Sequence, residues 1–404
     1  MFSGITLGVA ASLCAGVAFM ASPTSGSSQM PADTRAQFTP VIQEVPSQPR
    51  WFKGDDGRFH LEYEVFLTSV VPWVTEVDSI SVLDGRGHRI QRLSGDRLKS
   101  AMGFPWDSDK PKNALTPFAF KPVWIDLAFR KRRSVPLQVK HRLTITLPDG
   151  TPVGPEGKLT YTYTSSRVAV QNQAARVLAS PVRGGRWVTV VGAHRRSLQA
   201  INGRLRLGQR FAVDYSALLN GRDRTHRGSA SRNASYFNYG QPLLAVGDGK
   251  VVSVVDRYPD QIPNAAKPVP LEAADGNHVI IRLAKGVYAG YAHVKPGSVR
   301  IRPGQTVRKG QVLGKLGNSG NSTGPHLHFQ LMDRPSLLDA DGLPFTVDRF
   351  RFYGRVPSLE EFIDADREGT PVPINRSRAG NRHAQGLTGL DVVTFRKAGA
   401  SHSK

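Results

Sequence analysis

Cysteine is almost absent from this chain of 404 residues, which contains only Cys14. Cys14 lies inside an apolar N-terminal stretch, so a chain cleaved after that stretch would contain no cysteine at all. Disulfide bonds are therefore excluded as a source of stability. Beyond this stretch, no run of residues is long and apolar enough to span a bilayer.

Acidic residues are also scarce. The chain has 32 Asp and Glu against 54 Lys and Arg, which gives a formal net charge of +22. Such a surface attracts polyanions, so nucleic acid and the anionic polymers of a cell envelope are both candidate partners. We find no helix-turn-helix, zinc-finger or RNA-binding signature. We therefore expect a solvated basic surface, densest at residues 130–133, and no specific binding of nucleic acid.

The N-terminal stretch has the character of an export signal. Residues 5–21 are apolar and small, and Ser, Pro, Thr and Gly follow them. This pattern predicts a signal peptide over residues 1–22, and a secreted or cell-envelope protein. No Lys or Arg precedes the apolar run, so a retained N-terminal anchor is the alternative. The polar, Pro- and Ser-rich residues 23–50 are predicted to be a linker.

The next segment, residues 51–170, is predicted to form a β-sandwich. Short runs with alternating polar and apolar residues occur at 59–66, 80–83 and 141–147, and Asp-Gly pairs or Pro flank them. Period-two alternation between turn residues is typical of half-buried antiparallel strands, here in an immunoglobulin-like arrangement. This segment carries no recognisable catalytic motif.

A second domain is predicted over residues 180–355, and it also reads as all-β. The apolar runs on either side of Asp248-Gly249 predict a hairpin, and further strands follow. The expected strands are 242–246, 250–255, 278–283, 287–293, 312–316 and 326–332. Residues 368–404 are polar and basic, which predicts a flexible tail.

The most specific motif lies in residues 317–330, where a Gly-Asn-Ser-Gly loop leads into His326-Leu-His328. On a strand, residues two apart share one face, so both imidazoles would lie together while Leu327 and Phe329 face the core. Imidazole is both a common zinc ligand and an acid or base that works near neutral pH. This face can therefore hold a metal ligand beside a catalytic histidine.

A second histidine motif, Tyr291-Ala-His293, ends a predicted strand. The same alternation places Tyr291 and His293 on one face of that strand. His278 lies within another predicted strand, and we assign it no role.

Together, the loop with His326-Leu-His328, the Tyr291-Ala-His293 segment and the preceding Asp-Gly hairpin resemble the lysostaphin-type (LytM-like) zinc metallopeptidases. The resemblance covers about residues 190–350. It implies an antiparallel β domain (a duplicated hybrid motif), zinc as the cofactor, and hydrolysis of peptide cross-links or stem peptides in bacterial peptidoglycan. It also implies that His328 binds zinc and that His293 and His326 are catalytic.

The family's other zinc ligands come from a His-x-x-x-Asp motif, and here this sequence departs from it. Asp214 stands at the carboxylate position, but Arg210 stands where the histidine is expected. A guanidinium group stays protonated and cannot bind zinc. Arg210 should therefore not point into the site, and should turn outward or pair with a carboxylate. We favour His194 as the third ligand, with His226 next and Gln209 or water as further alternatives.

Two rival interpretations remain. A catalytically inactive LytM-like domain could bind the cell wall or activate a partner amidase, and Arg210 is the main support for that reading. Residues 299–314 also resemble a biotinyl or lipoyl carrier domain. A carrier needs a lysine at an exposed hairpin tip and has no use for His326 and His328. The sequence therefore favours a metalloendopeptidase.

Overall fold

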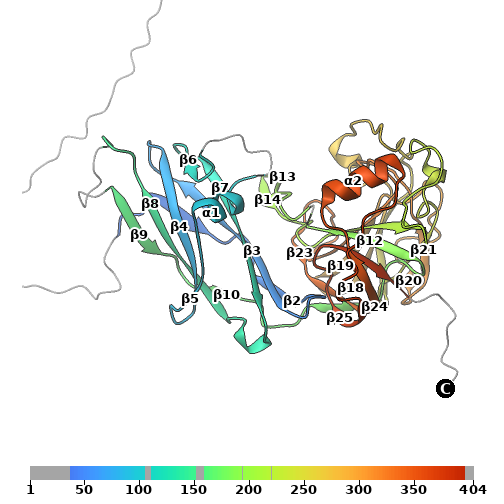
Figure 1. The fold of residues 1–404 in the computed structure, drawn as a ribbon, viewed down its shortest axis with the longest axis horizontal. Helices are drawn as coiled ribbons and strands as arrows, with labels where there is room; N and C mark the ends of the chain where they lie inside the picture. Colours follow the sequence, from blue (N-terminus) through green and yellow to red (C-terminus); the bar gives the residue numbers. More distant parts are fainter. Residues whose placement is uncertain (1–36, 105–110, 152–158, 193, 220, 396–404) are drawn as a thin grey trace, which may run out of the picture. The chain divides into compact units, whose positions relative to one another are not determined.

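The computed structural model describes residues 37–104, 111–151, 159–192, 194–219 and 221–395 (Figure 1). Residues Thr39–Lys404 form one compact unit. The signal peptide or anchor predicted over residues 1–22 lies outside the described residues. Within the described ranges, no helix is long and apolar enough to cross a membrane.

The first part of the compact unit consists of two antiparallel sheets. The four strands of one sheet are β1 (Val41–Glu44), β2 (Arg50–Lys53), β3 (Phe59–Ser69) and β7 (Phe120–Phe129). The six strands of the other are β4 (Thr75–Asp84), β5 (Arg89–Ser94), β6 (Ala114–Leu115), β8 (Gln138–Thr146), β9 (Thr160–Thr164) and β10 (Val168–Ala169). Helix α1 (Gly95–Ala101) follows β5, and a short 3-10 turn occupies Arg132–Ser134.

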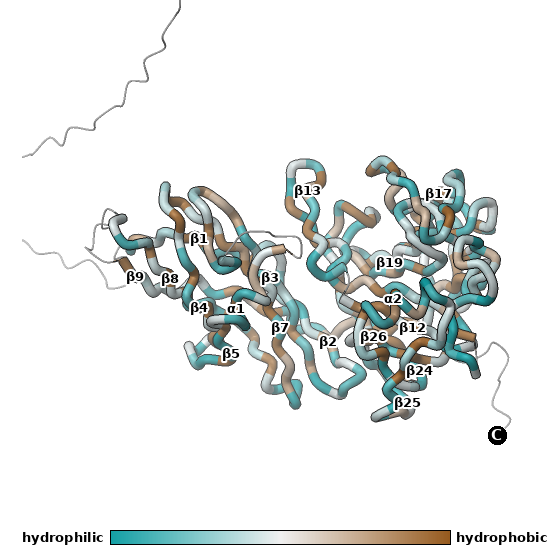
Figure 2. The backbone as a smooth tube through the Cα atoms, turned by 45° about the horizontal axis from the view of Figure 1, so that its top comes forward, coloured by the Kyte–Doolittle hydropathy of each residue, from teal (hydrophilic) through white to brown (hydrophobic). Residues whose placement is uncertain are grey.

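These two sheets face one another. Hydrophobic and hydrophilic residues alternate along their strands (Figure 2), and the buried set includes Leu61 and Leu143. The Tyr63 hydroxyl on β3 lies 2.9 Å from Nε2 of His141 on β8. Direct side-chain contact between strands of different sheets confirms the predicted β-sandwich architecture.

The predicted linker is wrong at its C-terminal end. Val41 to Glu44 form strand β1, which pairs with β3 and places Val41 opposite Ser69. Val41 is fully buried, and its amide and carbonyl both bond to the Tyr163 hydroxyl of the other sheet. A four-residue strand inside a Pro- and Ser-rich segment is too short to give a clear periodic signal.

We predict that His141 makes the sandwich sensitive to acid. Burial lowers the pKa of His141 to about 4. Between that value and its ordinary pKa the unfolded chain binds more protons, so stability falls as the pH falls. The free energy of unfolding should drop by about 2.5 kcal/mol from about pH 7.5 to about pH 4.5 through this group. Urea unfolding of His141→Gln should show a shallower pH dependence, and equal slopes for both proteins would contradict the prediction.

The second part of the unit is built on one large sheet. Its twelve strands are β11 (Arg176–Leu178), β12 (Arg186–Val191), β15 (Val213–Leu218), β17 (Gly249–Val255), β18 (His278–Ala284), β19 (Val287–Ala292), β20 (Thr306–Val307), β22 (Leu327–Met332), β23 (Gly342–Leu343), β24 (Phe345–Arg355), β25 (Gly380–Gln385) and β26 (Leu390–Thr394). Two separate pairs are β13 (Gln199–Ile201) with β14 (Arg204–Arg206), and β16 (Pro242–Leu244) with β21 (Val312–Lys315). Helix α2 (Leu359–Glu368) and 3-10 turns at Asn233–Ser235 and Leu271–Ala273 complete the described elements.

The order of the central strands positions the candidate site. Strands β12, β15, β22 and β19 are consecutive neighbours in the large sheet. Asp214 on β15 lies directly opposite His328 on β22, and Ala292 on β19 lies opposite His328 from the other side. Leu327 and Phe329 are fully buried in the core, as predicted from the alternation. The sheet thus brings segments more than 100 residues apart to one point.

The predicted hairpin across Asp248-Gly249 is wrong. Strand β16 pairs with β21, whereas β17 pairs with β18 and β20. The Asp-Gly turn is local, but the two apolar runs beside it enter different sheets. The second predicted pair is confirmed, because β18 and β19 are antiparallel neighbours.

The predicted end of the second domain and the start of the tail are also wrong. Strand β26 lies inside the large sheet, between β24 and β12, and Val392 and Val393 are fully buried. Strand β25 pairs with the other edge of β24. The domain therefore extends well past residue 355. Surrounding polar and basic residues masked these strands in the sequence, and residues 396–404 lie outside the described part.

Candidate metal centre and its cleft

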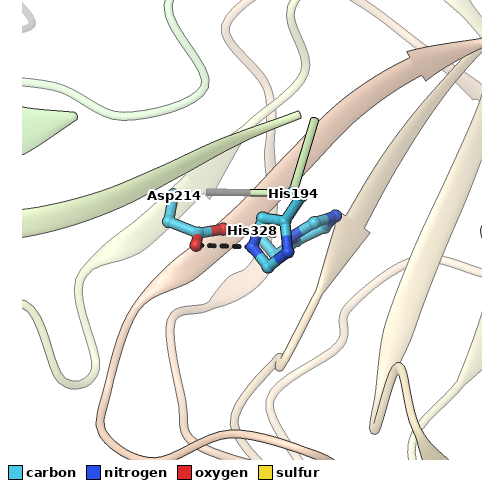
Figure 3. Close-up of side chains that lie close together, drawn as sticks. All are labelled: His194, Asp214 and His328. Atoms are coloured by element: carbon cyan, nitrogen blue, oxygen red, sulfur yellow. Dashed lines mark hydrogen bonds and ion pairs between the residues drawn. The ribbon is translucent and has the colours of Figure 1, made fainter. Parts of the chain in front are cut away.

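Three candidate ligands meet at one point (Figure 3). Nε2 of His194 lies 2.8 Å from Oδ2 of Asp214, and Nδ1 of His328 lies 2.9 Å from Oδ1 of the same carboxylate. One ligating atom from each residue lies within 4.8 Å of the other two. Two imidazoles and one carboxylate are a donor set found in catalytic zinc sites. The structure therefore brings together the three residues that the sequence analysis named as ligands.

His194 reaches this point because of how β12 is paired. Val190, near the end of β12, lies opposite Asp214 on β15. The chain then turns, and the Ser197 amide donates to the His194 carbonyl. His226, the other candidate, is not part of the cluster. Its Nε2 lies 2.8 Å from the Asp366 carbonyl oxygen, so this ring is held at the end of α2 instead.

Arg210 is turned away from the cluster, as predicted. Its buried guanidinium group donates to both oxygens of Glu64 and to Asp341 at 2.7 Å. Glu64 itself is fully buried, on β3 of the sandwich. Burial by itself would lower the pKa of Arg210, but the two carboxylates raise it. Arg210 therefore joins the second part of the unit to the sandwich and takes no part in the cluster.

The electrostatics of the cluster favour a bound cation. Burial by itself would raise the pKa of Asp214, but charge interactions with His326 and His194 and hydrogen bonds at both oxygens hold it well below its usual range. Burial would lower the pKa of His328, but the hydrogen bond and negative charge of Asp214 raise it. Asp214 is therefore ionised, and hydrogens bridge it to two imidazoles. A divalent cation would replace those hydrogens.

Gln330 fixes the orientation of His328. Its Nε2 donates to the Leu337 carbonyl at 3.0 Å, so Oε1 is the atom that faces His328 Nε2, also at 3.0 Å. An amide oxygen accepts only, so His328 carries a hydrogen on Nε2 and directs Nδ1 at Asp214. Gln330 is fully buried. The sequence analysis assigned it no role, although its place two residues after His328 on one strand face could have indicated this contact.

We predict that Gln330→Leu weakens zinc binding. Without the amide oxygen, the ring of His328 loses the contact that fixes its hydrogen on Nε2. Outer partners of this kind typically contribute about 10- to 100-fold to metal affinity. Competition with a chromophoric chelator would measure the loss. Gln330→Glu keeps an acceptor and should stay closer to the unsubstituted protein, so equal affinities in all three proteins would argue against this role.

The two histidines assigned catalytic roles lie beside the cluster. The ring centroids of His293 and His326 are 4.7 Å apart. Nδ1 of His293 lies 2.7 Å from the Ser319 carbonyl oxygen, and Nδ1 of His326 lies 2.9 Å from that of Gly324. Each Nδ1 therefore carries the hydrogen, which leaves Nε2 of the neutral ring as an acceptor. Burial lowers the pKa of both rings, so both are neutral at neutral pH.

His293 does not share a face with Tyr291, so that prediction is wrong. Strand β19 ends at Ala292, and His293 has a left-handed backbone with a φ of 59°. Tyr291 stays in the core, where its hydroxyl accepts from the Val246 amide. Because the alternation breaks at His293, its imidazole lies beside the imidazole of His326. A left-handed residue other than glycine costs about 1–3 kcal/mol, and such residues gather at functional sites.

The Gly-Asn-Ser-Gly loop holds His293 through its backbone. Gly320 has a φ of 82°, and a Cβ there would lie 2.3 Å from the Gly276 nitrogen. Only glycine permits this approach. The neighbouring Ser319 hydroxyl accepts from the Asn277 amide at 2.9 Å, and the Ser319 carbonyl accepts from His293. The loop therefore places the acceptor that orients His293.

The cluster opens into a cleft of about 790 Å³. His194, Asp214 and His326 line it from the sheet side. Helix α2 lines one wall, and residues 264–266 and 323–325 line others. A cleft beside buried histidines with shifted pKa values is typical of an active site.

Comparison with known proteins agrees with this site. Residues 232–340 match the model for Peptidase family M23, a segment that contains His293, His326 and His328. Peptidoglycan DD-endopeptidase ShyB of Vibrio cholerae is 28% identical over 136 residues, which cover 32% of this chain and 28% of that protein. DD-carboxypeptidase/endopeptidase Mpg of Neisseria meningitidis is 47% identical over 115 residues, which cover 25% of this chain and 24% of Mpg.

Each of these matches spans less than a third of the relative's own length. Among solved structures, the catalytic domain of lysostaphin from Staphylococcus simulans is 24% identical, with a TM-score of 0.22. The match covers 35% of this chain and 80% of that one. The resemblance on which the sequence analysis relied is confirmed by the family match. The chain carries a domain of peptidase family M23.

Proposed function

We propose that this protein is a zinc-dependent endopeptidase that hydrolyses peptide cross-links or stem peptides of bacterial peptidoglycan, and that it acts outside the cytoplasm or in the cell envelope. The observation that carries the proposal is the cluster of His194, Asp214 and His328 beside two neutral histidines in an open cleft. The relatives named as peptidoglycan endopeptidases support the substrate class. The net charge of +22 supports attraction to an anionic envelope.

The donor atoms fit zinc. Zinc in catalytic sites takes three protein ligands from nitrogen and oxygen donors and keeps one position open. His194, Asp214 and His328 supply two nitrogens and one oxygen, and His194 and Asp214 line the open cleft. When bound there, zinc would supply Lewis-acid activation of a water molecule and of the peptide carbonyl.

The chain's own residues supply the proton transfers. His293 and His326 present unprotonated Nε2 atoms near the cluster, so either can accept a proton from the attacking water. Nε2 of His326 lies 3.8 Å from Oδ1 of Asp214, which would stabilise the imidazolium that forms. The protonated Nε2 can then donate to the developing oxyanion or to the leaving amine. Hydrogen bonds at both Nδ1 atoms keep the rings oriented throughout.

The alternative interpretation, a catalytically inactive LytM-like domain, loses its main support in this arrangement. It depended on Arg210 in place of a ligand histidine. Arg210 binds Glu64 instead, and His194 provides a third donor from a different part of the chain. A protein that only binds the cell wall, or that only activates an amidase, would not need this donor set.

Digestion of purified peptidoglycan by the full chain tests the proposal. Mass spectrometry of the released fragments should show cleaved peptide bonds, with cleavage abolished by a chelator and restored by zinc. Asp214→Asn is the matched negative control. Sacculi that bind the protein but yield no new fragments with zinc present would favour the binding module instead.

A further inference from the structure

Helix α2 forms a wall of the cleft that holds the candidate ligands. Leu359 and Ile363 of this helix line the same cleft as Asp214 and His326. The helix lies after residue 340, beyond the segment that matches the peptidase family. It is placed where it can affect what enters the cleft.

The two faces of α2 have different roles. Phe362 and Ala365 are buried and pack in one cluster with Val188 and Val190 of β12. Leu359 and Ile363 are one turn apart, so they lie on the same side of the helix. They remain 41% and 43% exposed, respectively. Single exposed apolar residues are ordinary on protein surfaces, but this pair forms an aliphatic stripe inside a cleft.

Both ends of α2 are fixed, so the stripe has a defined position. At the start, the Ser358 hydroxyl caps the helix, because it accepts from the Glu361 amide and donates to the Glu361 carboxylate. At the end, Gly369 adopts a φ of 65° against the His226 ring, where a Cβ would lie 2.8 Å from a ring carbon. The Asp366 carbonyl accepts from His226 at 2.8 Å. His226 is buried, and its role is thus to anchor the C-terminal end of the helix.

The remaining lining is mixed. Ala265, Ala266, Thr323 and Pro325 are small, whereas Asp366 and Arg367 bring charge at the C-terminal end of α2. Between the small residues and the aliphatic stripe, the cleft suits an extended peptide with small apolar side chains, because burial of methyl groups against Leu359 and Ile363 is favourable.

We propose that Leu359 and Ile363 determine substrate specificity by contacting small aliphatic side chains next to the bond that is cut. This inference rests on the proposed endopeptidase function. It assigns no role in proton transfer or metal binding to either residue. Their effect should therefore fall on substrate affinity and selectivity.

The test compares Leu359→Ser, Ile363→Ser and the double variant with the unsubstituted full chain, on a cross-linked peptidoglycan fragment. Each single change should raise KM about fivefold and the double change more than about tenfold. The reason is that each serine removes the contact that roughly half of the aliphatic side chain makes with the substrate. The value of kcat and the zinc content should stay unchanged. Leu205→Ser, at a site 44% exposed on β14, is the matched control and should have no effect.

Conservative changes give a second readout. Leu359→Met and Ile363→Val keep an apolar surface and should keep KM near the unsubstituted value. Unchanged KM in the double serine variant would overturn the inference while leaving the proposed function intact. If the unsubstituted chain cuts nothing, the proposed function fails on its own. Calorimetric affinity for the same fragment then decides the inference, which predicts at least tenfold weaker binding for the double serine variant and is contradicted by equal affinities.

Discussion

Arg210→Met should lower the free energy of unfolding by about 3–5 kcal/mol. Glu64 is fully buried and receives three hydrogen bonds from Arg210, so the substitution leaves a buried carboxylate without its counter-ion. Breaking a buried ion pair from one side costs far more than the pair contributes net. Urea unfolding at neutral pH measures the effect. The double variant Glu64→Gln/Arg210→Met should recover part of the loss, because the fully buried carboxylate of Glu64 is then removed as well.

A matched control separates this effect from a general loss of positive charge. Arg349 is exposed and lies 3.9 Å from Asp348, so Arg349→Met should change stability by less than about 1 kcal/mol. Arg210→His is the more telling variant, since it restores the family's expected ligand residue. We expect it to be destabilised and to bind no more zinc. A gain of zinc affinity would show that residue 210 can still reach the metal site.

His194→Ala should remove zinc and reduce peptidoglycan hydrolysis by more than about 100-fold. Loss of a residue that only hydrogen-bonds to a metal ligand costs up to about 100-fold, and loss of a ligand should cost more. His194→Ala leaves only Asp214 and His328 as donors, which is fewer than catalytic zinc ordinarily requires. Metal analysis after dialysis and assay of released fragments would measure both losses.

His226→Ala provides the comparison within the same protein. Its imidazole binds the Asp366 carbonyl and lies outside the cluster, so zinc content should stay unchanged. The outcome that contradicts the assignment is a His194→Ala protein with full zinc and full activity. If His226→Ala lost its zinc instead, His226 would be the ligand and His194 would not.

Part of the site follows from the sequence by local rules. The spacing of His326 and His328 on a strand predicts one shared face, and the structure places Leu327 and Phe329 in the core behind them. Asp214 could be named only through the resemblance to a family motif. Its register opposite His328 then depends on pairing between β15 and β22, which local patterns do not specify.

The rest depended on long-range pairing or on unusual backbone. No local feature distinguishes His194 from His226, because the choice is made by where the chain goes after β12. The prediction that His293 shares a strand face with Tyr291 depended on strict alternation, and the left-handed backbone at His293 breaks that alternation. Strand β26 is buried between two strands from distant parts of the chain, although its surroundings resemble a flexible tail. Local composition carries little information about contacts of this kind.

Anomalous scattering at the zinc edge, from crystals of the full chain grown with zinc, tests the central claim most directly. We expect one strong peak at about 2.0–2.2 Å from Nε2 of His194, a carboxylate oxygen of Asp214 and Nδ1 of His328. The hydrogen bonds that now join these three side chains should be replaced by bonds to the metal. Crystals that hold zinc elsewhere, or none at all, while the three side chains remain hydrogen-bonded to one another, would contradict it.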